Sequence, residues 1–375
     1  MAKPRTAKAR EAQAANEERQ YCSVKASTPI EIPAGVGAER ASAIIVLGSK
    51  WSNGTLLHYY FYDDPQRDGE MVTLQDGTRE WRTYVGAEHQ RRIVRDAFVE
   101  WKALGIGLDF SETTDRSEAE IRIGFMRGDG SWSYVGKEVL DQGQDDRTMN
   151  FGWDLRGDPD TALHEIGHTL GLPHEHQNPN AGIVWNEEAV YLDFGAPPNK
   201  WKREKTHYNI IRKLESDSVQ GSSWDPDSVM HYSFKAGLIA RPEGYAGGLT
   251  PAGGLSARDV TWIKTFYPEI PSSALRALAP AQSQPLEVGN GDQANFIFEP
   301  EATRKYKVQM FGACDAQIVL FEDVGGEWRY LAADDDSGED RNALIDVRLR
   351  QGRRYAARVR LKYASGGAPP SVMIW

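Results

Sequence analysis

The amino-acid sequence predicts an α+β domain followed by an all-β sandwich. Helical and strand-like patterns are mixed through residues 44–268. Residues 269–285 are rich in Pro, Ala and Ser, which is typical of a linker. Residues 286–375 then show short alternating segments with turn residues between them and no helical period, as in a β-sandwich. A chain of 375 residues is also long enough for two domains.

The first domain is expected to contain two amphipathic helices. Residues 86–105 place six apolar side chains at helical spacing and end on a glycine. Residues 256–267 open with Ser256 and carry Asp259 three positions later, a capping box before an apolar face. Runs rich in β-formers predict strands at 56–62, 119–126 and 148–155.

Charge and cysteine content exclude several classes of protein. A net charge of −10 argues against nucleic acid or an anionic membrane as the main partner, since both require a basic face. No apolar run approaches the roughly 20 residues that span a bilayer, and the best run, at 41–48, is too short. Cys22 and Cys314 allow one disulfide at most. The oligomeric state is left open.

Residues 1–43 form a polar lead, which we interpret as a helix-prone, disordered or pro-segment region. The first twenty residues begin basic but have no apolar core, so they are not expected to act as a signal peptide. Three alternatives stay open: the protein remains inside the cell, leaves it by an unconventional route, or is numbered without its leader.

The densest chemistry lies in TALHEIGHTLGLPHEH at 161–176. Asp158, Pro159 and Gly171 are suited to the start and the end of a helix here. His164 and His168 lie one turn apart, opposite an apolar face made by Leu163, Ile166 and Leu170.

Glu165 lies at the edge of the histidine face, so the pattern is H-E-x-x-H, two zinc ligands and a general base. His174 follows ten residues after His164 and supplies a third ligand. Three neutral imidazoles favour zinc and leave a fourth position for water. Glu165 would take a proton from that water and deliver it to the leaving amine. His176 has no role in this prediction, and ordinary core or surface histidines are the weaker alternative.

The string HEIGHTLGLPHEH resembles the zinc motif of the metzincin metallopeptidases, and Glu175 after the third histidine narrows the resemblance to the astacin family, peptidase family M12A. DSVMHYSF at 227–234 resembles the Met-turn of that family. The resemblance implies that Met230 forms a floor beneath the zinc and that Tyr232 is a displaceable ligand that stabilises the oxyanion. It also implies that Glu175 receives a new N-terminal ammonium after cleavage near 41–46; a plain surface carboxylate is the alternative.

The resemblance covers about residues 44–268. It implies a metzincin (zincin-like) catalytic domain with a twisted mixed sheet and an active-site helix, a zinc metalloendopeptidase that acts on proteins or peptides, and a secreted or extracellular location. Residues 119–136 would provide the edge strand along which substrate binds, unless they form a plain sheet strand and loop. The zinc motif continues without the usual arginine, and the domain lacks the usual disulfides. Both departures point to a divergent bacterial type.

Cys22 lies upstream of this domain, and a thiolate binds zinc well. It could occupy the fourth zinc position and keep the enzyme latent, pair with Cys314, or stay a free thiol; Glu31 could play the latency role instead. Two other functions stay open: a binding or adhesion module with a structural or vestigial zinc site, and a hydrolase of cell-wall peptide.

The sandwich at 286–375 resembles the pre-peptidase C-terminal domains of bacterial proteases. Its stretch 332–343 clusters five acids, for which calcium binding is one interpretation. A solvated turn is favoured, because the spacing matches no fixed calcium loop. The five acids are Asp334, Asp335, Asp336, Glu339 and Asp340.

Overall fold

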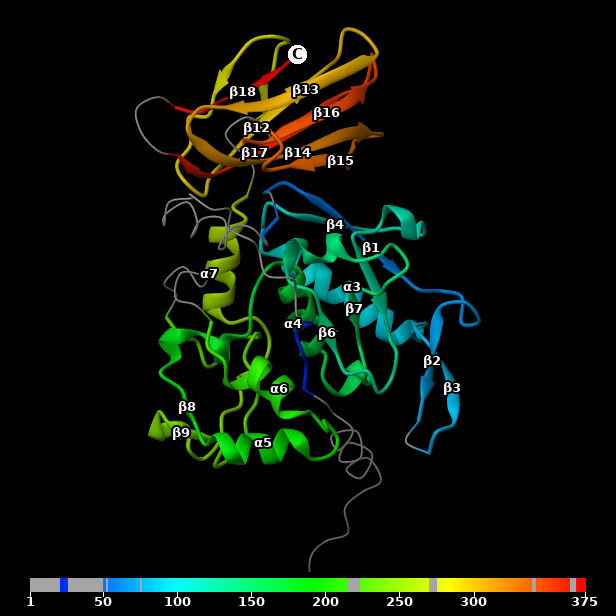
Figure 1. Ribbon diagram of the computed structural model, residues 1–375, viewed down its shortest axis with the longest axis vertical. Helices are drawn as coiled ribbons and strands as arrows, with labels where there is room; N and C mark the ends of the chain where they lie inside the picture. Colours follow the sequence, from blue (N-terminus) through cyan, green and yellow to red (C-terminus); the bar gives the residue numbers. More distant parts are fainter. Residues whose placement is uncertain are drawn as a thin grey trace, which may run out of the picture. The chain divides into compact units, whose positions relative to one another are not determined.

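The structure is a computed structural model, and its described residues form two compact units. Among the described residues, the first unit comprises 21–25, 58–74, 76–103, 111–214 and 223–262. The second comprises 50–51, 53–57, 104–110, 263–269, 275–338, 342–364 and 369–375 (Figure 1). The predictions for most of the lead, for Glu31, for part of the linker, and for Glu339 and Asp340 lie outside the described residues. The described residues are 21–25, 50–51, 53–74, 76–214, 223–269, 275–338, 342–364 and 369–375.

A five-stranded mixed sheet has the strand order β4-β1-β5-β7-β6. β1 pairs with β5 and β5 with β7 in parallel, whereas β6 pairs antiparallel with β7 and forms one edge. The predicted strand at 148–155 is paired over only two residues, and just beyond them Gly152 lies against the backbone of Gly130. The strands are β1 (Leu56–Phe61), β4 (Asp109–Glu112), β5 (Ile121–Gly124), β6 (Trp132–Ser133) and β7 (Met149–Asn150).

Two helices pack on one another in this part of the molecule. α3 (Glu88–Ala103) buries the apolar face that the sequence predicts, and α4 (Asp160–Thr169) is buried on all sides. The indole N–H of Trp101 donates to the carbonyl of Leu163 at 3.2 Å, which fixes α3 against the histidine helix. α4 begins after Pro159, so Asp158 is not its N-cap; the Asp158 carboxylate accepts a hydrogen bond from the Thr161 hydroxyl instead.

The capping box at the last helix of the domain is confirmed. α7 (Ala257–Phe266) begins where the Ser256 hydroxyl accepts a hydrogen bond from the Asp259 N–H at 2.9 Å. The Asp259 carboxylate in turn accepts from the Ser256 N–H at 3.0 Å. Because each residue satisfies the other's exposed donor, the start of the helix is fixed to within one residue.

Shorter elements complete the first unit. The remaining helices are α5 (Glu187–Gly195) and α6 (Arg203–Thr206). β2 (Gly69–Thr73) and β3 (Arg79–Thr83) form a hairpin, and β8 (Val184–Trp185) pairs antiparallel with β9 (Ile239–Arg241), which lies far from it in the sequence. The short helical segments are η1 (Arg116–Glu118), η2 (Gly136–Asp141), η3 (Leu155–Gly157), η4 (Glu175–Gln177), η5 (Pro179–Ala181), the π-helical η6 (His207–Ile211), and η8 (Glu243–Tyr245).

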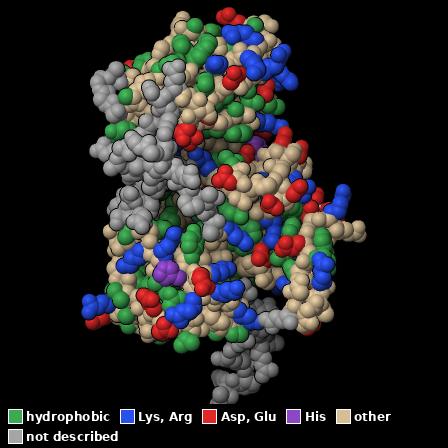
Figure 2. All heavy atoms as spheres, viewed as in Figure 1, with side chains coloured by type: hydrophobic (Ala, Val, Ile, Leu, Met, Phe, Trp, Pro, Cys, Tyr) green, Lys and Arg blue, Asp and Glu red, His purple; other side chains and the backbone are tan. Residues whose placement is uncertain are grey.

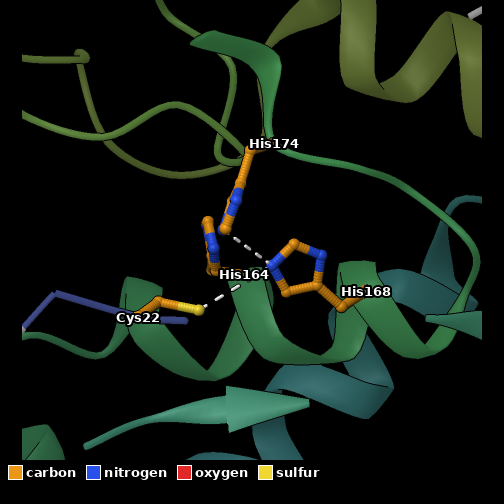
Figure 3. A group of neighbouring side chains, drawn as sticks. All are labelled: Cys22, His164, His168 and His174. Atoms are coloured by element: carbon orange, nitrogen blue, oxygen red, sulfur yellow. Dashed lines mark hydrogen bonds between the residues drawn. The ribbon is translucent and has the colours of Figure 1, made fainter. Parts of the chain in front are cut away.

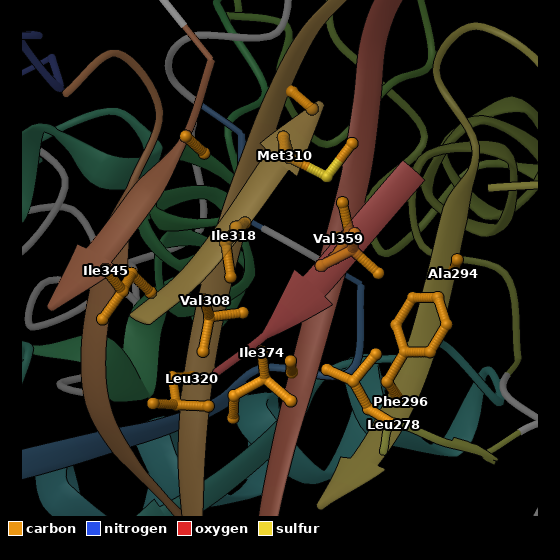
Figure 4. Close-up of a cluster of buried hydrophobic side chains, with 14 of the residues drawn as sticks. Leu278, Ala294, Phe296, Val308, Met310, Ile318, Leu320, Ile345, Val359 and Ile374 are labelled. Carbon is orange, nitrogen blue, oxygen red and sulfur yellow. The ribbon is translucent and has the colours of Figure 1, made fainter. Parts of the chain in front are cut away.

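The second unit contains the all-β sandwich. Its two sheets have the orders β10-β12-β17-β14-β15 and β11-β18-β13-β16. Alternate side chains of each strand enter a shared apolar core, which includes Phe296, Val308 and Val359 (Figure 4). The strands are β10 (Leu275–Ala277), β11 (Gln284–Pro285), β12 (Gln293–Phe298), β13 (Arg304–Phe311), β14 (Cys314–Val324), β15 (Glu327–Asp334), β16 (Leu344–Leu349), β17 (Tyr355–Ala364) and β18 (Ser371–Ile374).

The calcium interpretation of the acidic stretch is not supported. The Asp334 carboxylate accepts hydrogen bonds from the Ser337 N–H and hydroxyl and from the Leu344 N–H, so it stabilises a turn. Asp335 forms an ion pair with Lys362 at 3.1 Å. The Asp334 carboxylate therefore stabilises the loop, and the Asp335 carboxylate pairs with a side chain of β17.

On the face drawn in Figure 2, acidic and basic side chains are interspersed over the described surface. Within the described ranges, no helix combines the length and the apolar character that crossing a membrane requires.

Candidate metal centre

Three histidines and one cysteine converge in the first unit. His164 and His168 project from one face of α4, because they are four residues apart. Gly171 has φ of +90°, a left-handed conformation that glycine tolerates, and the chain turns there to bring back His174. One ligand atom from each of these histidines and the Cys22 sulfur all lie within 4.8 Å of one another, and their side chains point toward a common centre (Figure 3).

The protonation of the imidazoles suits a metal ion. His164 Nδ1 donates to the Val229 carbonyl at 2.7 Å, and His168 Nδ1 donates to the Leu172 carbonyl at 2.8 Å. Carbonyl oxygens only accept, so in a neutral ring Nδ1 carries the proton and Nε2 offers a lone pair to the centre. Burial lowers the pKa of His168 and His174 well below the ordinary value, which keeps both rings neutral.

The donor set fits zinc. His168 Nε2 and His174 Nε2 are 3.1 Å apart, and the Cys22 sulfur is 3.8 Å from His168 Nε2. Two imidazole lone pairs at that distance repel unless a proton or a cation lies between them. Three neutral imidazole nitrogens and a thiol are the ligand types that zinc prefers.

Glu165 is fully buried beside these ligands. Burial raises its pKa to about 8, and a hydrogen bond from the Cys22 thiol acts in the opposite direction. Among the described residues, neither of its oxygens has a nitrogen or oxygen partner. A buried carboxyl group with a pKa near neutrality can both accept and release a proton.

Met230 packs directly against α4. A Cβ placed on Gly167 would overlap the Met230 sulfur and approach its methyl group at 3.3 Å. Gly167 therefore leaves the space into which Met230 fits beneath the histidines. The family resemblance predicts this position for Met230, whereas no sequence motif predicts a role for Gly167.

Asp259 connects the start of α7 to the segment that carries Met230. Its carboxylate accepts hydrogen bonds from the Ser228 hydroxyl at 2.6 Å and the Val229 N–H at 2.8 Å. The Val229 carbonyl is the acceptor that orients His164. The sequence identified Asp259 only as a helix cap, because this second set of contacts depends on the tertiary fold.

Tyr232 lies at the centre with its phenol between two groups. The phenol oxygen is 2.8 Å from His174 Nε2, and its O–H donates to the Cys22 carbonyl at 2.5 Å. Burial raises the pKa of Tyr232, so the phenol is neutral and can donate. This arrangement places a hydrogen-bond donor next to a peptide carbonyl at the metal centre.

Glu175 is tied into the neighbouring backbone. Its carboxylate accepts hydrogen bonds from the Asp225 N–H at 2.9 Å and the Asn178 amide at 3.1 Å. Burial raises its pKa to about 7. His176, which has no predicted role, is buried and donates from Nε2 to the Asn209 carbonyl at 2.8 Å; it is outside the cluster of candidate metal ligands.

The segment 21–25 runs past the edge of the five-stranded sheet. The Ser23 N–H donates to the Ser131 carbonyl at 3.1 Å, immediately before the edge strand β6. The Val24 N–H donates to the Asn209 side chain at 2.9 Å. Cys22 itself is buried, and both cysteines of the chain are free thiols, so the alternative of a disulfide with Cys314 is wrong in this structure.

The edge strand predicted within residues 119–136 is shorter in the structure. Within the stretch 119–136, β5 is an interior strand and only β6, at residues 132 and 133, lies at the edge. The short length of β6 left no alternation in the sequence that could distinguish it from a loop.

Comparison with known proteins shows what residues 82–241 are similar to. Residues 82–241 match the family model Astacin (Peptidase family M12A). The chain is 32% identical over 147 residues to Blastula protease 10 of Paracentrotus lividus, over 38% of this chain and 22% of that protein. It is 29% identical over 147 residues to Metalloendoproteinase 1-MMP of Arabidopsis thaliana, over 33% of this chain and 39% of that protein.

A solved structure of myroilysin is 29% identical, covers 60% of this chain and 97% of its own, and has a TM-score of 0.48. The matched part spans only 39%, 21% and 22% of the length of three curated relatives. Over residues 82–241 the chain is therefore similar to the astacin-like metallopeptidases, and its mixed α+β architecture agrees with that similarity.

Proposed function

We propose that the chain is a zinc-dependent metalloendopeptidase that hydrolyses peptide bonds in proteins or peptides. The observation that carries the proposal is the convergence of His164, His168 and His174 next to the buried carboxyl group of Glu165. The family match supports it, because it covers this centre.

Each residue would have a separate task. His164, His168 and His174 would hold the zinc ion, which when bound supplies Lewis-acid chemistry. Glu165 would take the proton of the attacking water and deliver it to the leaving amine, a task suited to a pKa near neutrality. Tyr232 would donate its O–H to the carbonyl oxygen as negative charge develops there. Met230 would support the histidines from below.

We further propose that the chain as described is latent. The Cys22 sulfur occupies a fourth position among the ligands, and the Cys22 carbonyl takes the hydrogen bond of Tyr232. A peptide substrate cannot use either position while segment 21–25 is in place. Removal or displacement of the segment would open the centre, and Glu175 could then receive a new N-terminal ammonium.

Several predictions from the sequence stay proposals. These are the domain limits 1–43, 44–268, 269–285 and 286–375, the bacterial type, the pre-peptidase C-terminal character of the sandwich, and a secreted or extracellular location.

The test is casein hydrolysis by the chain, with the segment intact and after limited proteolysis at the lead. Metal analysis should give about one zinc per chain. Glu165→Gln should bind zinc but lose hydrolysis, and a zinc chelator should abolish the activity of the parent chain. Activity that survives either treatment would refute the proposal.

A second candidate is a binding module with a structural zinc site. The presence of four protein ligands favours it, since structural zinc sites are closed. It predicts no hydrolysis in any processed form. Hydrolysis of cross-linked peptidoglycan, assayed beside casein, would distinguish a cell-wall peptide hydrolase from a peptidase that acts on proteins and from a binding module.

A further inference from the structure

The side chain of Tyr21 is held in an aromatic site of the first unit, defined here as Phe194, Asn199, Tyr232, Ser233 and Phe234. The centroid of the Tyr21 ring lies 4.6 Å from that of Phe194, 5.4 Å from that of Tyr232 and 6.4 Å from that of Phe234. The three rings of the site belong to one buried apolar cluster. The aromatic site therefore surrounds an aromatic side chain on several sides.

The aromatic site also binds both polar ends of Tyr21. The phenol O–H donates to the Ser233 carbonyl at 2.8 Å, and the Tyr21 N–H donates to the Asn199 side chain at 2.9 Å. Phenylalanine would fill the same space but would leave the Ser233 carbonyl without this donor. The contacts thus distinguish tyrosine from other apolar residues.

The rest of the segment is held through its backbone. The N–H groups of Ser23 and Val24 donate to the Ser131 carbonyl and the Asn209 side chain, and the Cys22 carbonyl accepts from Tyr232. Any peptide offers the same N–H and C=O groups. Selectivity must come from side chains. The Lys25 ammonium lies over the Trp132 ring at 4.2 Å, and the Tyr21 ring packs among the aromatic rings next to the metal centre.

Two connections place the aromatic site next to the metal centre. Tyr21 and Cys22 are adjacent in the chain, and Cys22 contacts the ligand cluster. Tyr232 is shared, because its ring packs on Tyr21 and its phenol oxygen is 2.8 Å from His174 Nε2. A peptide whose backbone passed the centre as the segment does would place one side chain among these rings.

We infer that the aromatic site is a substrate subsite for an aromatic side chain, tyrosine above all, next to the residue bound at the metal centre. The inference rests on the proposed peptidase function. When the segment leaves, the rings of Phe194 and Phe234 lose the cover of Tyr21. A substrate ring restores that burial, whereas an alanine side chain does not.

The test measures binding without turnover. The full chain carrying Tyr21→Ala, Cys22→Ala and Glu165→Gln is titrated with labelled peptides of the sequence Glu-Arg-Gln-X-Ser-Ser-Val-Lys-Ala, where X is Tyr, Phe, Leu or Ala. The Tyr peptide should bind about 30-fold more tightly than the Ala peptide, from burial of a large side chain. It should bind roughly 2- to 10-fold more tightly than the Phe peptide, from the hydrogen bond to Ser233.

Matched variants locate the selectivity. Phe194→Leu should reduce the Tyr-to-Ala ratio to below about 5-fold, since it removes the ring nearest to Tyr21. Phe298→Leu, at an equally buried phenylalanine of the second unit, should leave the ratio unchanged. Phe234→Leu replaces Phe194→Leu if circular dichroism shows that the latter fails to fold.

A Tyr-to-Ala ratio near one, or a ratio that survives the loss of the ring, overturns the inference. The same chain with Glu165 restored is then given a peptide library, and aromatic residues should be enriched at one position beside the cleaved bond. Selective binding without any cleavage would refute the proposed function and leave the aromatic site as a peptide-binding site. Cleavage without aromatic enrichment would support the proposed function and overturn the inference that the aromatic site is a substrate subsite.

Discussion

Replacing Gly167 by alanine tests whether Met230 supports the histidine helix. In the interior of a helix, Gly→Ala normally stabilises by about 1 kcal/mol. Here the new Cβ overlaps the Met230 sulfur, which cannot retreat freely because the side chain is buried. Overpacking of this kind costs about 1–3 kcal/mol. We therefore expect a net loss of about 1 kcal/mol, opposite in sign to the helix propensity.

In a chain that also carries Met230→Ala, the substitution Gly167→Ala should stabilise the fold rather than destabilise it. Met230→Ala alone costs about 2–5 kcal/mol, since it leaves a cavity beneath α4. With the sulfur gone, the alanine at position 167 regains its helical advantage and stabilises by up to about 1 kcal/mol. The coupling between the two substitutions is then about 2 kcal/mol, a size typical of residues in contact.

The assay is differential scanning calorimetry of the four chains of this cycle. The transition that shifts when zinc is added marks the first unit, and about 1 kcal/mol corresponds to roughly 2–4 °C in its midpoint. If Gly167→Ala raises the midpoint both in the parent chain and in the Met230→Ala chain, the placement of Met230 is refuted.

Three further predictions concern groups around the centre. Asp259→Ala leaves the Val229 N–H and the Ser228 hydroxyl without their acceptor, so we expect a loss of about 2–4 kcal/mol by calorimetry and roughly 10- to 100-fold weaker zinc binding by competition with a chelator. Asp259→Asn keeps one acceptor oxygen, so its losses of stability and of zinc affinity should each be less than half of those of Asp259→Ala. Equal losses in the two variants would contradict the hydrogen-bond argument. Cys22→Ser replaces the sulfur ligand by a weaker one, so the uncut chain should hydrolyse casein at least about tenfold faster than the parent, and an unchanged rate would show that the thiol does not restrain the centre. Tyr232→Phe removes the donor to a substrate carbonyl and should lower kcat by roughly 10²- to 10³-fold in the opened enzyme, whereas a change confined to KM would assign the phenol to binding.

The convergence of the three histidines could be predicted from the sequence because it depends on local geometry. His164 and His168 share a face in any helix, and Gly171 is required wherever the chain turns back to place His174. The capping box of α7 is local in the same way. Each of these needs fewer than a dozen residues of chain.

Residues that act through tertiary contacts could not be foreseen in this way. Asn199 and Asn209 bind the segment 21–25, although the two hydrogen bonds join residues 178 and 185 positions apart in the sequence. The hydrogen bond from Val229 to Asp259 joins the segment that carries Met230 to the first turn of α7, and no sequence pattern indicates that approach. Gly167 did carry a signal: a glycine inside a helix costs about 1 kcal/mol relative to alanine and usually has a packing reason.

The single proton of Tyr232 would link the proposed latency to the proposed catalysis. The phenol oxygen lies close both to His174 Nε2 and to the Cys22 carbonyl, yet one O–H can donate in only one direction. The His174 ring is neutral, and its Nε2 lone pair is needed for zinc, so the carbonyl takes the proton and the phenol turns a lone pair toward the centre. A substrate carbonyl in the place of the Cys22 carbonyl would find the same donor already oriented. The group that holds the segment at the centre is therefore also the group that would stabilise the reacting carbonyl, and displacement of the segment requires a substrate to compete for that hydrogen bond.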